Sequence, residues 1–144
     1  MPEKETLERA RRDKREGKAP STQAGEFVRE EIEHIREGKH GARSTKQAIA
    51  IGLSKARRAG VDLPPSKGSS EETKEQAERD LRKARTGGKK SAKRSRATRK
   101  ALKREGRSAA SKEALSTQAR KAARKRSAAS RSRSAKKAAA TRKK

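Results

Sequence analysis

The chain has 144 residues, of which 27% are hydrophobic and 43% are charged, with Phe27 as the single aromatic residue and no cysteine. Low hydrophobicity together with a formal net charge of +26 excludes one large core and favours extensive disorder in the isolated chain. The lack of cysteine excludes disulfides and thiolate metal sites, and the basic charge points to a polyanionic partner.

The first predicted element is a charged helix over residues 3–16, which ends at Gly17. The beginning of the chain has no apolar core of the kind that signal peptides carry, and its acidic side chains argue against a transit peptide. The longest apolar run, residues 48–53, is far shorter than a membrane span. We therefore expect a soluble, cytoplasmic protein.

The next two predicted helices, about residues 21–37 and 44–59, are the best candidates for a packed hairpin. Ser44 and Gln47 have the spacing of a capping box at the start of the later helix, and Gly60 follows its end. The expected core residues are Phe27, Ile32, Ile35, Ile49 and Leu53. The small residues Ala48, Gly52 and Ala59 extend the arc of the later helix and would let the two helix backbones approach closely.

A fourth helix, about residues 70–85, follows Pro64 and Pro65, which do not allow the preceding helix to continue. Ser69 and Glu72 repeat the capping-box spacing at its start. Its apolar stripe is weak, so we expect it to flank the hairpin as a charged helix.

Basic charge is concentrated in the last part of the chain. Residues 1–86 carry 21 basic and 16 acidic side chains, whereas residues 87–144 carry 23 basic and two acidic ones. Gly87 and Gly88 mark the change in composition. We therefore divide the chain into a charged N-terminal helix (1–17), a hairpin module (18–66), a linker with a charged helix (67–86) and a basic low-complexity tail (87–144).

The tail consists almost entirely of Lys, Arg, Ala and Ser. Ala, Lys and Arg are strong helix formers, but repulsion between like charges four residues apart opposes a helix. We expect the tail to be disordered in isolation, or to become helical when a bound anion neutralises it. The predicted fold is therefore mostly α-helical with a large disordered fraction, built on a small helical hairpin core.

No catalytic constellation is apparent, and we predict that the protein is not an enzyme. His34 and His40 are the only histidines, and because no metal-ligand spacing appears, we expect neither a metal site nor a cofactor. His34 is expected beside Glu30 on the surface. Glu31, which interrupts the apolar arc of its helix, is expected at the rim of that arc.

The later helix of the hairpin is predicted to face nucleic acid. The helix over residues 21–37 carries five Glu and two Arg, whereas the one over residues 44–59 carries only basic charge. Phosphates would be attracted to the second face, to the free N–H groups at its start and to the tail, although the same basic face could instead balance the acidic helix intramolecularly. The predicted nucleic-acid-binding residues are Lys39, Arg43, Ser44, Lys46, Gln47, Lys55, Arg57, Arg58, Lys89, Lys90, Lys93, Arg94, Arg96, Arg99, Lys100, Lys103, Arg104, Arg120, Lys121, Arg124, Lys125, Arg126, Lys136, Lys137, Arg142, Lys143 and Lys144.

Two recognition motifs match the connection between these helices only in part. The connection GKHGAR is longer than the turn of a helix-turn-helix motif. Its GKHG portion has the GXXG form by which KH modules hold an RNA backbone, but no accompanying sheet is predicted. A chain with one aromatic residue also lacks side chains for base stacking. We therefore expect contacts with the phosphate backbone and little reading of bases.

The run GKHGARSTKQAIAIGLSKARRAG, residues 38–60, resembles a family of small basic bacterial proteins of uncharacterised function, often described as DNA-binding or histone-like. The resemblance extends over about residues 1–85 and implies a bacterial, cytoplasmic setting, without assigning binding residues. In composition, the tail resembles the tails of linker histones and the Lys/Ala-rich extensions of bacterial nucleoid proteins.

These observations predict a non-enzymatic, nucleoid-associated protein that binds DNA largely without sequence preference. Two alternatives remain open. The chain could be an RNA-binding or ribosome-associated protein that uses the same charge. It could also be an adaptor, in which the hairpin binds a protein partner or a second copy of the chain while the tail tethers it to nucleic acid.

Overall fold

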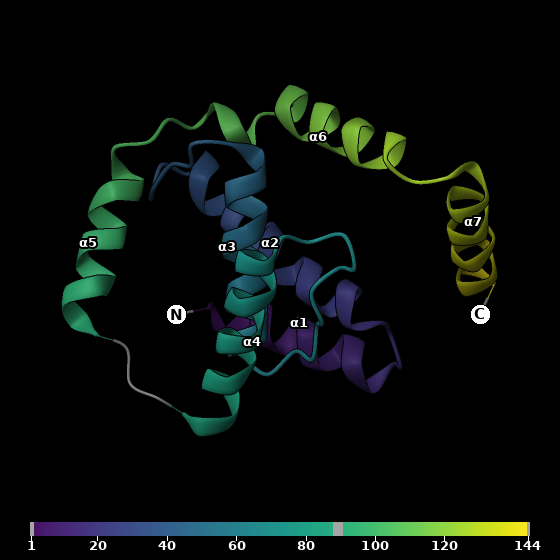
Figure 1. Cartoon of the computed structure of the whole chain (residues 1–144), viewed down its shortest axis with the longest axis horizontal. Helices are drawn as coiled ribbons and strands as arrows, with labels where there is room; N and C mark the ends of the chain where they lie inside the picture. The colour runs from purple at the N-terminus through teal and green to yellow at the C-terminus, as the bar shows by residue number, and fades with distance from the viewer. Residues whose placement is uncertain (1, 88–90, 144) are drawn as a thin grey trace.

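A computed structural model of the chain describes residues 2–87 and 91–143. This part contains seven α-helices and one short 3₁₀ turn, is 73% helical and holds no strand (Figure 1). The elements are α1 (Lys4–Arg15), α2 (Pro20–Arg36), α3 (Thr45–Arg58), α4 (Glu71–Thr86), α5 (Ala92–Lys103), η1 (Ser108–Ala110), α6 (Lys112–Arg124) and α7 (Ala128–Arg142). None of the helices in these ranges combines the length and the apolar character that a membrane crossing needs.

The prediction of a large disordered fraction is wrong, because α5, α6 and α7 occupy most of the described tail. Each of these helices begins at a serine whose hydroxyl accepts a backbone N–H three residues later, at Ser91, Ser111 and Ser127. Such caps contribute about 1 kcal/mol each and add to the high helix propensity of Ala, Lys and Arg, and both oppose the few tenths of a kcal/mol lost in each like-charge pair. Sequence reasoning gave repulsion too much weight against capping and the high helix propensity of Ala, Lys and Arg.

The first four helices lie close to where the sequence places them. Gly17, Gly38, Gly60 and Gly87 follow them with φ values of 74°, 80°, 101° and 64°, which side chains other than glycine rarely adopt. The predicted capping box of α3 forms only in part. The hydroxyl of its N-cap, Ser44, accepts the Gln47 N–H, but the Gln47 side chain accepts the N–H of Arg43, one residue before the cap, and not that of Ser44. The cap of α4 is one residue later than predicted, at the next serine.

The hairpin of α2 and α3 packs through small residues of α3. A Cβ atom on Gly52 would lie 2.6 Å from the Cα atom of Val28, so the two backbones are in direct contact. Ala48 and Ala56, one turn to either side, are fully buried.

Three of the predicted core residues, Phe27, Ile32 and Ile35, are buried as predicted. The prediction for Ile49 and Leu53 is wrong in part: both are only half-buried, because α3 turns its small residues toward α2 and leaves the larger ones beside the contact.

Two flanking helices enlarge this core. Leu7 and Ala10 of α1 join a cluster with Phe27, Ala56 and Val61, so the N-terminal helix packs on the hairpin. On the other side, α4 lies along α3, where the fully buried Ala77 forms part of the contact.

The tail returns to the hairpin after α5. From Leu102 to Leu115 the chain crosses the end of the hairpin where α2 and α3 are joined, and we call these residues the docking segment (Figure 1). Ala109 and Ala110 of η1 are buried there in a cluster that includes Ile35. The core of the hairpin is therefore completed by side chains that lie more than sixty residues away in sequence.

Polar contacts hold the docking segment in place. The backbone N–H of Gly41 donates to the carbonyl of Leu102 at 2.8 Å, and Ala42 N–H donates to the Gly106 carbonyl at 3.0 Å. The Thr45 hydroxyl donates to the carbonyl of Ala109 at 2.7 Å. In addition, the guanidinium of Arg36 donates to the carbonyl of Ala110 at 2.8 Å.

Candidate functional site

The basic residues in the second half of α3 are engaged inside the fold. Lys55 forms an ion pair with the buried Glu31 of α2, and Arg58 Nε lies 2.8 Å from Asp80 Oδ1 of α4. Arg57 is 8% exposed and donates from Nε to the carbonyl of Leu63 at 2.8 Å. Burial lowers the pKa of the Arg57 guanidinium from its ordinary value. These three cations hold neighbouring elements together rather than forming an open basic face.

The start of α3 is more accessible. Arg43 and Lys46 are exposed, and neither forms an ion pair with another residue of the described ranges. The side chains of Ser44 and Gln47 accept backbone N–H groups at the start of the helix. Lys39 lies 3.2 Å from a carboxylate oxygen of Glu37 and 3.4 Å from one of Glu3, and hydrogen bonds with these two carboxylates raise the Lys39 pKa. Of the predicted binding residues between Lys39 and Gln47, Arg43 and Lys46 therefore remain available to a ligand.

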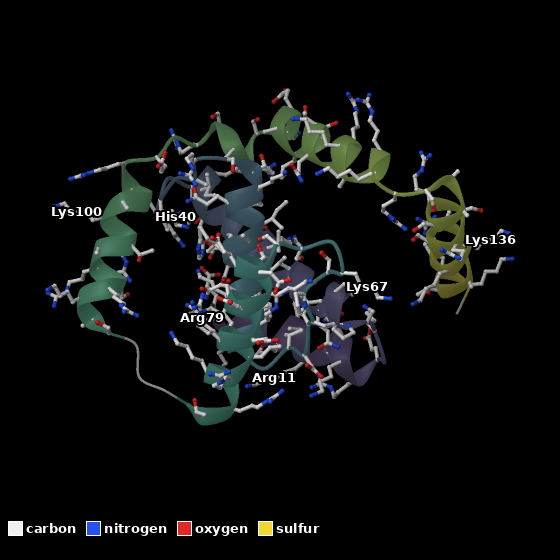
Figure 2. The ribbon with its side chains drawn as sticks, viewed as in Figure 1. Arg11, His40, Lys67, Arg79, Lys100 and Lys136 are labelled. Atoms are coloured by element: carbon white, nitrogen blue, oxygen red, sulfur yellow. The ribbon has the colours of Figure 1, made fainter. Side chains whose placement is uncertain are left out.

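The cations of the tail differ from those of α3 in their exposure and in their ion pairing. Every Lys and Arg in residues 91–143 is exposed, and within the described ranges all ion pairs join side chains of residues 3–80. Figure 2 shows nitrogen-tipped side chains projecting from α5, where Lys100 is labelled, and from α7, where Lys136 is labelled. The predicted residues in this group are Lys93, Arg94, Arg96, Arg99, Lys100, Lys103, Arg104, Arg120, Lys121, Arg124, Lys125, Arg126, Lys136, Lys137, Arg142 and Lys143, whereas Lys89, Lys90 and Lys144 lie outside the described residues.

On α5 these cations form a stripe. Lys93, Arg96, Lys100 and Lys103 are separated by three, four and three residues, which places them on one face of a helix. No residue of α5 is buried, so nothing in the described chain covers this face. We call these four residues the α5 stripe.

A second group of ionisable residues lies where the hairpin loop meets α2. Glu31 is fully buried, and its Oε2 atom lies 3.0 Å from Nε2 of His40, while its Oε1 atom contacts Lys55. The other ring nitrogen of His40, Nδ1, lies 2.9 Å from the carbonyl oxygen of Gly41. His40 is on the loop between α2 and α3 (Figure 2), and its ring meets that of His34 edge-on, with centroids 6.3 Å apart.

His34 links this group to the N-terminus. Its Nε2 atom lies 2.9 Å from Oε1 of Glu3, and hydrogen bonds from His34 and then Lys39 lower the pKa of the Glu3 carboxyl. Glu30 is 2% exposed and accepts the backbone N–H of Glu3 with one oxygen. His34 is thus near Glu30, as predicted, but it lies in a partly covered cluster with its closest contact to Glu3 and not on an open surface.

Sequence reasoning missed this cluster, which we call the Glu–His cluster: Glu3, Glu30, Glu31, His34 and His40. The prediction that Glu31 lies at a rim is wrong, since its exposed fraction is 0%. One signal was available in the sequence, because Glu31 and His34 are three residues apart and therefore share a helix face. The approach of Glu3 and His40 depends on how α1 and the hairpin loop pack, which no spacing within α2 reveals.

Comparison with known proteins finds similarity to one family, whose function is unknown. No curated protein and no solved structure matches the chain. Residues 4–67, which run from α1 through α3 into the following loop, are similar to a family of unknown function (DUF6496), in line with the resemblance to uncharacterised proteins and without any statement about DNA.

Proposed function

We propose that the chain binds DNA with little sequence preference, and that the cations of α5, α6 and α7 supply most of the affinity. The observation that carries this proposal is the contrast in charge pairing. The cations of α3 largely face carboxylates or carbonyls of the fold, whereas those in residues 91–143 are exposed without an acidic partner in the described ranges. Unpaired cations at this density attract a polyanion, and their contacts with phosphates release counterions.

The α5 stripe supports the proposal geometrically. Its members extend over ten residue steps, about 15 Å at 1.5 Å per residue, so one helix face can meet several phosphates of a duplex. Contacts with phosphates position a protein without specifying bases. The single aromatic residue, Phe27, is 1% exposed and cannot stack on bases, which favours a duplex over a single strand.

The hairpin has a smaller part in this proposal than its charge suggests. Only Arg43 and Lys46 at the start of α3 are positioned to add phosphate contacts, because Lys55, Arg57 and Arg58 are engaged within the fold. The helical core of α1–α4 then acts as a scaffold onto which the docking segment fastens the cationic helices. In a bacterial cell such a protein would associate with the nucleoid.

The test compares two variants of the full chain that lose the same charge. In one, the α5 stripe is neutralised by Lys93→Gln, Arg96→Gln, Lys100→Gln and Lys103→Gln. In the matched control, four exposed cations of α1 and α4 are neutralised by Arg11→Gln, Lys14→Gln, Arg15→Gln and Arg82→Gln. Affinity for two unrelated DNA duplexes is measured across a range of salt concentrations, with circular dichroism as a check on helix content.

We expect the α5 variant to lose up to about 3.6 from the slope of log affinity against log salt, at about 0.9 per phosphate contact. The control should lose much less, and both duplexes should give the same result. Equal losses in the two variants would mean that only net charge matters. Tighter binding of duplex RNA than of DNA would favour the RNA alternative, and no saturable binding of either at low salt would favour the protein adaptor.

A further inference from the structure

The Glu–His cluster contains a set of donors suited to a metal ion. Glu31, His34 and His40 each offer one ligand atom, and these three atoms all lie within 4.8 Å of one another. Two imidazoles and one carboxylate form the mixed nitrogen and oxygen set that zinc and related divalent ions accept, with further positions left for water. We propose that these three residues bind a divalent transition-metal ion of the zinc class, a site that the sequence analysis did not predict.

The hydrogen bonding of His40 prepares one ligand atom. Its Nδ1 atom lies 2.9 Å from the carbonyl oxygen of Gly41, an acceptor that requires a proton on Nδ1. In the neutral ring, Nε2 then carries the lone pair, and this atom faces Oε2 of Glu31 at 3.0 Å. Metal-binding histidines are commonly held in this way, with the second nitrogen donating to a backbone carbonyl or a carboxylate.

An unsatisfied buried oxygen is the second observation. Glu31 is fully buried, and its Oε2 atom accepts no hydrogen bond from the described residues, although His40 is close. Oε2 of Glu30 is also buried without a hydrogen bond. Leaving a buried carboxylate oxygen without a partner is costly. A cation between Glu31 and the two histidines would remove that cost at Glu31, while Lys55 remains on Oε1.

The surrounding charges favour a cation. The cluster contains the carboxylates of Glu3, Glu30 and Glu31, and the nearby cations are Lys39 and Lys55, which leaves one net negative charge when both imidazoles are neutral. Glu3 also contacts His34 at 2.9 Å, so it is placed to orient that ring as a carboxylate does beside a metal-bound histidine.

The location suggests what the ion would stabilise. His40 belongs to the hairpin loop and the other two ligands to α2, so a shared ion would fix the loop against the helix. The next residue, Gly41, donates its N–H to Leu102 of the docking segment. Metal binding should therefore stabilise the attachment of the tail as well as the hairpin.

The test uses the full chain without an affinity tag and free of nucleic acid, titrated with Zn²⁺ and, separately, with Mg²⁺. Calorimetry should give one saturable Zn²⁺ site and no comparable Mg²⁺ site. Because the chain has two histidines, the imidazole region of its NMR spectrum contains two sets of signals, and both should shift together as Zn²⁺ is added. Co²⁺ in place of Zn²⁺ should produce visible absorption typical of a nitrogen and oxygen site.

Substitutions then identify the ligands. Glu31→Gln, His34→Gln and His40→Gln should each weaken Zn²⁺ binding at least tenfold, the scale seen even for residues that only support a ligand. The matched control is Glu33→Gln, which removes an exposed carboxylate of the same helix and should leave the affinity unchanged. Absence of a saturable Zn²⁺ site, a shift of only one histidine, or binding that survives both histidine substitutions would overturn the proposal. If a variant fails to fold, the NMR titration of the native chain decides the question by itself.

Discussion

Gly41 and Glu105 meet so closely that a Cβ atom on Gly41 would lie 2.0 Å from the carbonyl oxygen of Glu105. The N–H of Gly41 also donates to the carbonyl of Leu102, so the hairpin loop and the docking segment join through their backbones. The second glycine of the GKHG sequence is therefore needed because any side chain at this position would clash with the backbone of the tail. Its φ is not positive, and close approach is the reason that no side chain fits there.

Replacing Gly41 with alanine should detach the docking segment. We expect a loss of about 1–3 kcal/mol in the free energy of unfolding, the usual range for overpacking. The Ala42 N–H, which donates to Gly106, should exchange faster with solvent. Denaturant unfolding and amide exchange measure the two effects. The control is Gly25→Ala, where no atom lies within 4 Å and a helical position should gain about 0.5–1 kcal/mol. Equal stability of the two variants would contradict the docking geometry.

Gly52→Ala tests the contact between α2 and α3. Although alanine is the better helix former, its Cβ would lie 2.6 Å from Val28 Cα, so we expect a net loss of about 1–3 kcal/mol in thermal or urea unfolding. Because the nearest atom belongs to the backbone, adding Val28→Ala should not restore stability. Full recovery in that double variant would show that the helices are separated by side chains rather than packed backbone to backbone.

Arg58 should matter for stability as the partner of a buried carboxylate. Asp80 is fully buried, and without Arg58 its Oδ1 atom would retain only the Gln76 amide at 3.1 Å. Since Arg58 is 36% exposed, we expect Arg58→Met to cost about 1–3 kcal/mol, below the range for a fully buried pair. Adding Asp80→Leu should recover part of this loss. Arg82→Met, at an exposed site of α4, is the control, and a similar effect there would argue against the ion pair.

Removal of residues 128–144 should weaken DNA binding and leave the stability of the fold nearly unchanged. α7 buries no residue, so the free energy of unfolding should change by less than about 0.5 kcal/mol. The deletion removes seven basic residues, which would lower the salt slope of DNA binding by at most about six. A longer deletion from residue 92 also removes Ala109 and Ala110 from the core and should destabilise the hairpin. Equal stability of the two truncated chains would mean that the docking segment contributes nothing to the fold.

The sequence by itself determined where the first four helices begin and end, to within about one residue. Ser44 with Gln47 and the glycines after the first four helices act within a few residues of chain, so their effects can be read locally. The tail helices obey the same local rules, and their serine caps were visible. The prediction of a disordered tail rests on repulsion between neighbouring cations set against helix propensity alone, and it leaves out the serine caps.

Only the tertiary structure decided that the small residues of α3 rather than Ile49 and Leu53 form the centre of its contact with α2, that Glu31 lies inside, and that the tail closes over the hairpin loop. Gly52 rather than Ile49 faces α2, because a glycine lets the two helix backbones come closer together than a large side chain would allow. The buried Glu31 carboxylate is compensated in part by Lys55, which reaches it from α3. The docking of Leu102 on Gly41 joins residues far apart in sequence. Each of these features depends on which segments pack together, and the hydrophobic periodicity of one segment does not specify the segment on which it packs.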